Sequence, residues 1–174
     1  MTDLKKETAT DDIAYIRTDR MRYEKNKISS NLALLSIVLN ALFFISIYKS
    51  NVGQWYYTIL IGISIVYNLL FMMFVFLIAE GSKNYMINYS YLAVVIGILQ
   101  FCRILVYPRI AHSATITSAD QTIQVMGDAQ FIRQIVYLVA SGICLLVSAL
   151  IGIRKCKELS SHMKALSEKE KKAA

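Results

Sequence analysis

Four long apolar runs dominate this sequence of 174 residues and constrain its fold more than any other feature. They cover residues 32–48, 55–79, 86–107 and 131–153. A helix needs about 20 apolar residues to cross the hydrocarbon core of a bilayer, and the first run is at the short limit of that length. A transmembrane β-barrel would show alternating segments of about 10 residues, which are absent here. We therefore predict an all-α membrane protein whose four transmembrane helices form an antiparallel bundle.

The polar stretches around the runs define the expected organisation of the chain. They give a cytoplasmic N-terminal segment (1–31), a transmembrane domain (32–153) with an outer loop (108–130), and a basic cytoplasmic tail (154–174). The tail contains neither Gly nor Pro, so we expect the fourth helix to continue into it. Its apolar side chains recur at spacings of three and four, as in a heptad seam: Cys156, Leu159, Met163 and Leu166.

Basic residues are divided unevenly between the two sides of the predicted bundle. Fifteen Lys and Arg residues fall in the N-terminal segment, the tail and the connection between the second and third helices, whereas four fall on the other side. Positive residues favour the cytoplasmic face, so we expect both termini inside a cell membrane, either plasma or inner. Anionic lipid headgroups are then expected partners of the basic tails. Nucleic-acid binding is not expected, because it would need a basic folded face.

Two asparagines interrupt the first two runs near their middle. Counted from the cytoplasmic side at about 1.5 Å per residue, Asn40 and Asn68 lie at nearly the same depth. Because the two helices are expected to be antiparallel, we predict a hydrogen bond between these amides that mainly fixes the helix register. The alternative is that both amides line a polar path through the membrane.

A second set of polar side chains lies in the outer half of the third and fourth runs: Gln100, Arg103, Arg133, Gln134 and Tyr137. If these two helices pack together, the matching depths predict a polar cluster under the outer surface. Arg103 is about one turn from the interface, where a long basic side chain can extend to a lipid phosphate. We interpret Arg103 as an anchor at the membrane edge. Binding of an anionic ligand and pairing with Asp128 are the alternatives.

Small side chains recur every four residues along the fourth run: Ala140, Cys144, Ser148 and Gly152. A shorter pair, Ala93 and Gly97, occurs in the third run. Small residues let helix backbones approach closely, which favours helix association in lipid. We predict that this stripe lies against another helix, either within the chain or in another membrane subunit.

The sequence contains no pattern typical of catalysis, metal binding or cofactor binding, and its three cysteines are not spaced as metal ligands. No Asp or Glu lies inside an apolar run, which disfavours a cation-coupled transporter. We therefore expect a non-catalytic accessory or scaffold subunit of a larger membrane complex, for example a transport complex. It would bind a membrane protein partner or associate with itself. The alternative is a homo-oligomeric channel or transporter with a polar path near Asn40 and Asn68.

Overall fold

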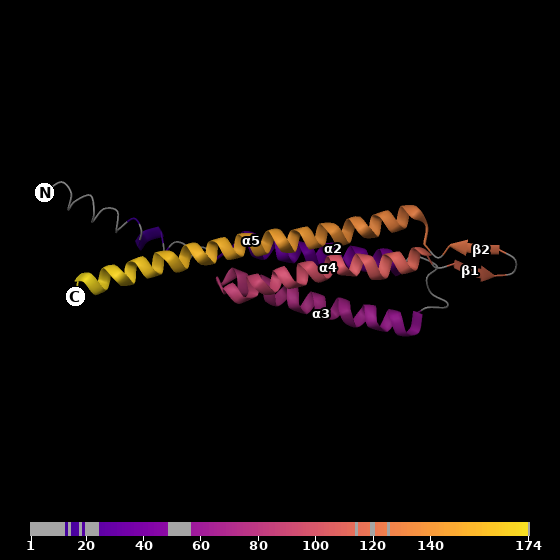
Figure 1. Ribbon diagram of the computed structural model, residues 1–174, viewed down its shortest axis with the longest axis horizontal. Coiled ribbons are helices and arrows are strands. Elements are labelled where there is room, and N and C mark those ends of the chain that lie inside the picture. Colours follow the sequence, from indigo (N-terminus) through magenta and orange to yellow (C-terminus); the bar gives the residue numbers. More distant parts are fainter. Residues whose placement is uncertain are drawn as a thin grey trace.

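A computed structural model of the chain describes residues 13, 15–17, 19, 25–48, 57–113, 115–118, 121–124 and 126–173. Figure 1 shows its elements in chain order: α2 (Lys27–Tyr48), α3 (Tyr57–Lys83), α4 (Ile87–Ser113), β1 (Thr115–Ser118), β2 (Gln121–Gln124) and α5 (Asp128–Ala173). Within these residues, four helices are long and apolar enough to cross a membrane. Residues 55–56, where the second span was predicted to begin, and most of the predicted N-terminal segment lie outside the described residues.

A tight turn joins α3 to α4 through hydrogen bonds that close the end of α3. The Met86 amide donates to the Gly81 carbonyl at 3.0 Å, and the Tyr85 amide donates to the Ser82 carbonyl at 3.3 Å. This pattern is a Schellman motif, in which the residue after the helix takes a left-handed conformation. Tyr85 holds that position with a φ of 58°. A side chain at Gly81 would overlap the Tyr89 ring, so the glycine lets α4 fold back against α3.

The segment predicted as an outer loop, 108–130, is largely helix and strand. α4 continues through Pro108 and ends at Ser113, so the proline does not end the helix as expected. β1 and β2 then pair as an antiparallel hairpin, which the alternating Thr and Ile residues favour. α5 begins at Asp128, three residues before the fourth apolar run. The all-α class is therefore correct for the four long apolar helices and wrong for this hairpin.

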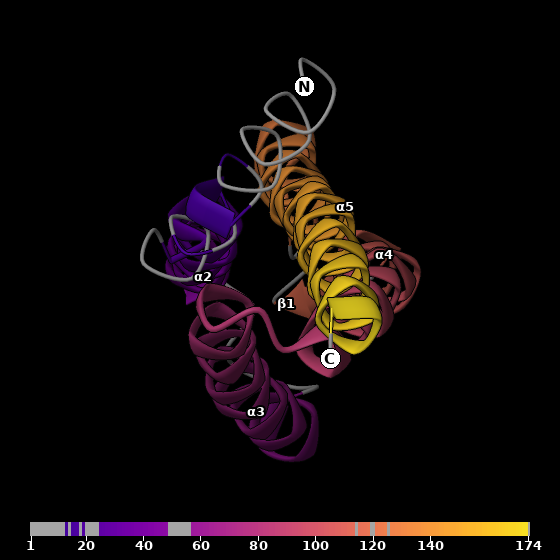
Figure 2. The ribbon, with the colours of Figure 1, turned by 90° about the vertical axis from the view of Figure 1, so that its left-hand side faces the viewer.

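Each of the four long helices packs against two neighbours, as the end-on view in Figure 2 shows. α5 contacts α2 and α4, and α3 contacts the same two helices. α5 is the longest element, with 46 residues. At 1.5 Å per residue its length is about 70 Å, more than twice the roughly 30 Å of the hydrocarbon core. The fourth span and the tail thus form one helix that extends beyond the others (Figure 1).

Two apolar clusters lie between the helices. The larger one is near the α3–α4 turn and includes Ala33, Phe71, Val75, Ile78, Ala93, Leu145 and Ala149. The smaller one, towards the hairpin, contains Phe43, Ile47 and Leu138. Many large apolar side chains remain exposed on the outside, as expected for a surface in contact with lipid. Because lipid tails are as apolar as these side chains, close packing and polar contacts must also hold the helices together.

Candidate functional site

Five buried polar side chains from all four long helices form one hydrogen-bonded group, called here the polar cluster: Asn40, Asn68, Gln100, Arg103 and Ser141. Asn40 Nδ2 donates to Asn68 Oδ1 at 3.1 Å, so the predicted hydrogen bond between the two amides is present. Asn40 Oδ1 also accepts from Gln100 Nε2 at 3.2 Å and from Arg103 Nη1 at 3.0 Å. Gln100 Nε2 is in addition 3.3 Å from Ser141 Oγ. Asn40 is therefore the centre of the cluster, and no member is more than 9% exposed.

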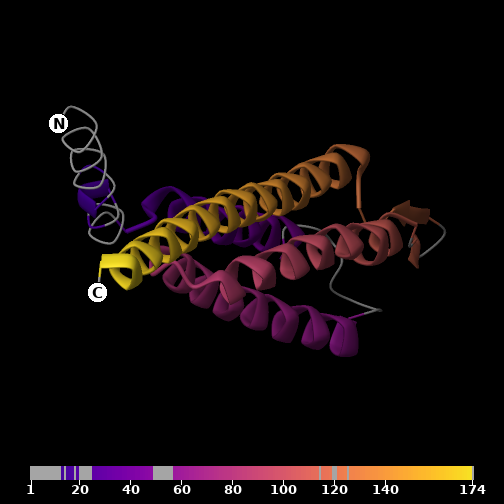
Figure 3. The same cartoon turned by 60° about the vertical axis from the view of Figure 1, so that its left-hand side comes forward.

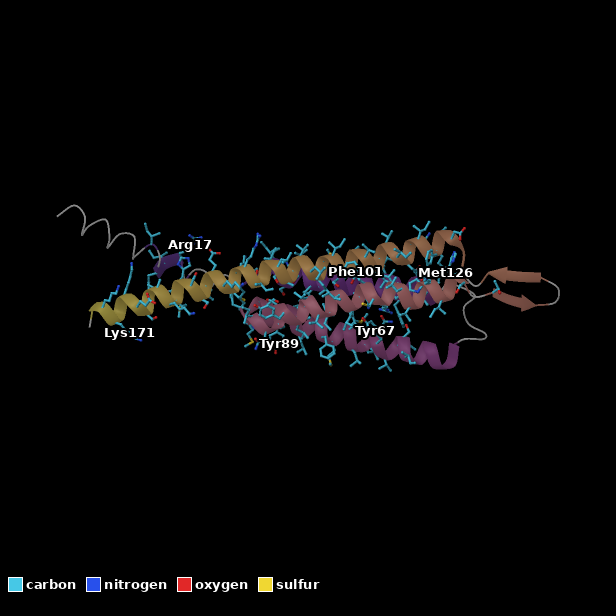
Figure 4. The ribbon with its side chains drawn as sticks, viewed as in Figure 1. Arg17, Tyr67, Tyr89, Phe101, Met126 and Lys171 are labelled. Atoms are coloured by element: carbon cyan, nitrogen blue, oxygen red, sulfur yellow. The ribbon has the colours of Figure 1, made fainter. Side chains whose placement is uncertain are left out.

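Arg103 points into the helix packing and not toward lipid, so its interpretation as an interfacial anchor is wrong. Its guanidinium carbon lies 4.4 Å from the centre of the Phe43 ring and 4.7 Å from the centre of the Tyr67 ring. Tyr67 is labelled on α3 in Figure 4. Cation–π contacts of a desolvated cation stabilise by about 2 kcal/mol. The two rings and Asn40 thus surround the charge in place of a lipid headgroup.

A cavity of about 290 Å³ lies between α3 and α4, beside Arg103. Figure 3 shows that these two helices meet at their turn and diverge toward their other ends. The walls of the cavity are formed by Ile63, Ser64, Tyr67, Leu99, Cys102, Arg103 and Val106. Most of these groups are apolar, so the cavity offers few contacts that could orient a polar ligand.

Two serine pairs join α2 to α5, and we call them the serine ladder. The hydroxyls of Ser36 and Ser141 are 2.7 Å apart, and those of Ser29 and Ser148 are 3.0 Å apart. Ser141 and Ser148 also donate to the carbonyls of Ser36 and Ser29, at 3.1 Å and 2.7 Å. The pairs are seven residues apart on both helices, so the same two faces meet every two turns. Sequence reasoning missed three of the four serines, although this seven-residue spacing was a usable signal.

The predicted stripe on α5 does not form a single buried face. Ser148 and Gly152 are buried, whereas Ala140 and Cys144 are only half-buried. A side chain at Gly152 would overlap the hydroxyl of Ser90 on α4, so this contact lies within the chain. A spacing of four residues advances the side chain by about 40° around a helix with 3.6 residues per turn. Three such steps turn the stripe by about 120°, so its four residues do not share one contact face, and only Ser148 and Gly152 of the predicted stripe are buried.

The other predicted residues are distributed over several environments. Ala93 belongs to the larger apolar cluster, and a side chain at Gly97 would lie 3.0 Å from Leu146. Tyr137 packs on the smaller apolar cluster. Gln134 is fully buried, and its amide nitrogen and oxygen have no hydrogen-bond partner within the described part of the chain.

Arg133 is exposed, on a different side of α5 from Gln134. The group of polar residues predicted between the third and fourth helices is therefore not found as one cluster. Gln100 and Arg103 join Asn40 of α2, while Arg133 stays outside the cluster.

The chemistry of the polar cluster is that of amides, a hydroxyl and one guanidinium. These groups can hold four helices in register, and they include no carboxylate, imidazole or thiol that could act as a base. In the residues that the structure describes, no group of three or more His, Cys, Asp and Glu side chains is placed to hold a metal ion. Comparison with protein-family models, with curated proteins and with solved structures finds no match. Four helices long and apolar enough to cross a membrane are compatible with the class of a helical multi-pass membrane protein.

Proposed function

We propose that this protein is a non-catalytic accessory or scaffold subunit of a larger membrane complex. The observation that supports this most is the C-terminal part of α5, residues 154–173, called here the α5 arm. The arm extends beyond the other long helices (Figure 1). At 1.5 Å per residue it is roughly 30 Å long. A helix of this length gives another protein a large surface to bind.

The arm is fixed at its base, which suits a docking element. It continues directly from the packed part of α5, where Ser148 bonds to α2 and Gly152 lies close to α4. Arg17 and Glu158 form an ion pair of 2.8 Å that links the N-terminal segment to the arm. Exposed ion pairs contribute about 0–1 kcal/mol, so this pair serves orientation more than stability.

We further propose that both termini are cytoplasmic and that the membrane is a cell membrane. The uneven division of basic residues supports this orientation. The arm then projects into the cytoplasm. Its lysines lie near the anionic headgroups of the inner leaflet or near an acidic partner.

A homo-oligomeric channel or transporter with a path near Asn40 and Asn68 is the alternative. These two amides are 0% and 3% exposed and are hydrogen-bonded to each other. A path between them would have to break this bond and separate α2 from α3. The packed state therefore favours a structural role for the polar cluster over a permeation role.

The proposal can be tested by site-specific photo-cross-linking in cells. A photoreactive residue is placed at Ala165, which is exposed on the arm, or at Ser113, which is exposed at the end of α4. We expect a foreign membrane protein to cross-link from Ala165 but not from Ser113, and to co-purify with the full chain. Cross-links only between copies of this chain would support the homo-oligomeric alternative. The absence of any specific product from Ala165 would contradict the proposal.

A further inference from the structure

A groove of mixed polarity lies between the C-terminal end of α2 and the N-terminal end of α5. Its cavity has a volume of about 370 Å³. Its walls are formed by Leu42, Ile45, Ser46, Ala129, Gln130, Arg133 and Tyr137. Small-molecule sites have volumes of about 300–1,000 Å³, so this space is sufficient for a headgroup or part of a chain. We call it the α2–α5 groove, and it lies at the end of the helices opposite to the α5 arm (Figure 1).

The two walls of the groove differ in polarity and in direction. In a helix the Cα–Cβ bonds tilt toward the N-terminus. On α5 this tilt directs Arg133 and Tyr137 toward the hairpin end of the molecule, where the membrane interface lies. On α2, which runs the opposite way, it directs Leu42 and Ile45 toward the membrane centre. The groove is therefore cationic and polar near the interface and apolar deeper in the membrane.

We propose that the α2–α5 groove binds a glycerophospholipid with an anionic headgroup. The phosphate lies against the guanidinium of Arg133, and an acyl chain lies along Leu42 and Ile45. The proposal needs only that the helices cross a membrane, and it does not depend on the accessory function proposed above.

The groups that line the groove fit this ligand. Arg133 is exposed, and a guanidinium presents paired donors that match a phosphate. Leu42 and Ile45 are 42% and 55% exposed, so they offer apolar surface to a chain. Tyr137 is half-buried, and tyrosine rings favour the headgroup level.

Two further observations concern rigidity and charge. Gln130 Nε2 donates to the Ser46 carbonyl at 2.7 Å, which links the two walls before any ligand binds. A preformed site loses less free energy on ordering when the ligand binds. Among the residues that the structure describes, the lining of the groove includes Arg133 and no carboxylate. The Asp128 carboxylate lies 2.9 Å from His112 Nε2 on α4, and Asp128 is not among the residues that line the groove. The net positive charge favours phosphatidylglycerol over phosphatidylcholine.

Native mass spectrometry of the full chain in detergent tests the proposal. Phosphatidylglycerol, phosphatidylcholine or inorganic phosphate is titrated onto the wild type, onto Arg133→Gln and onto Arg109→Gln. Arg109 is exposed near the C-terminal end of α4 and does not line the groove, so Arg109→Gln is the matched control. We expect Arg133→Gln to bind phosphatidylglycerol about tenfold more weakly, from the loss of charged hydrogen bonds, while Arg109→Gln binds as the wild type does. Circular dichroism checks that all three chains are folded.

A second variant tests the acyl-chain half of the groove. Ile45→Trp fills the apolar part without removing a charge, and we expect it to weaken phosphatidylglycerol binding as well. Equal affinities of Arg133→Gln and Arg109→Gln for phosphatidylglycerol would overturn the proposal. It would also be overturned if phosphatidylcholine bound as tightly as phosphatidylglycerol. Displacement of the lipid by inorganic phosphate, with no effect of Ile45→Trp, would show a free-phosphate site instead.

Discussion

The two faces of α5 that contact neighbouring helices are held by different chemistry. Toward α2, Ser141 and Ser148 form hydrogen bonds to serine side chains and carbonyls. Toward α4, a side chain at Gly142 would lie 2.8 Å from the Phe101 ring, and one at Gly152 would overlap a serine hydroxyl. Figure 4 labels Phe101 on α4. The serine face fixes which residues pair, whereas the glycine face fixes how closely the backbones approach.

This difference predicts different sensitivities to substitution. Hydrogen bonds between membrane helices contribute about 0.6 kcal/mol on average and about 1.7 kcal/mol at most. Overpacking a closely packed contact costs roughly 1–3 kcal/mol. Bulk on the glycine face should therefore destabilise more than loss of a hydroxyl on the serine face. Reversible unfolding in mixed micelles with sodium dodecyl sulfate measures both.

The largest effect is expected for Gly152→Leu. Its new side chain would meet Ser90 on α4 and lie 3.3 Å from the Ser29 hydroxyl on α2, so both faces are disturbed together. We expect the free energy of unfolding to fall by about 3 kcal/mol, at the upper end of overpacking costs. Leu150→Phe is the control, because Leu150 is 60% exposed and faces lipid. Equal losses for the two variants would show that α5 is not held closely at this point.

Asn40→Leu should have the next largest effect. Asn40 accepts from both Gln100 and Arg103 and donates to Asn68, so its loss leaves several buried groups without this partner. We expect a loss of about 2 kcal/mol, within the range for a buried polar group left unsatisfied. Asn68→Leu removes only the bond to Asn40 and should cost less.

The same two variants separate the structural role of the polar cluster from a permeation role. In liposomes that hold the reconstituted protein, ion flux should not depend on either substitution. If a wild-type flux exists and a folded Asn68→Leu abolishes it, the channel alternative is correct.

The serine ladder should show smaller, pairwise effects. Ser36→Ala and Ser141→Ala form a double-mutant cycle across one rung, with hydroxyls 2.7 Å apart. We expect a coupling of about 0.6 kcal/mol, and not above about 1.7 kcal/mol. Ser29→Ala combined with Ser141→Ala joins residues of different rungs and should show almost no coupling. Similar coupling in both cycles would mean that the hydroxyls act through general packing and not through paired bonds.

The transmembrane spans could be predicted from the sequence because they depend on length and polarity alone. The contact of Asn40 with Asn68 could also be predicted, since depth in the membrane follows from counting residues. The same count cannot say which way a side chain points around its helix. The interpretation of Arg103 as an anchor was therefore wrong, because its side chain points toward Phe43 and not toward lipid.

The hairpin and the extension of α4 were missed for a different reason. A proline and a polar composition usually mark the end of a helix, because proline lacks an amide donor and its ring clashes with the preceding turn. Pro108 is buried within α4, so packing outweighs the local preference. Such tertiary effects are not visible in a single sequence.

Cys144→Leu should have the smallest effect of the series, and it tests the rotation of the stripe around α5. If all four small residues formed one close contact, Cys144→Leu and Ser148→Leu would be equally damaging. The structure instead leaves Cys144 half-buried, while Ser148 is buried and bonded to Ser29. We expect Cys144→Leu to change the free energy of unfolding by no more than about 0.5 kcal/mol, as is usual for sites away from packed contacts. Ser148→Leu should cost several times more, because it adds bulk and removes a rung of the ladder. A large loss of unfolding free energy for Cys144→Leu would show that Cys144 belongs to the contact face of α5. The side of α5 that carries Cys144 would then be covered by another helix.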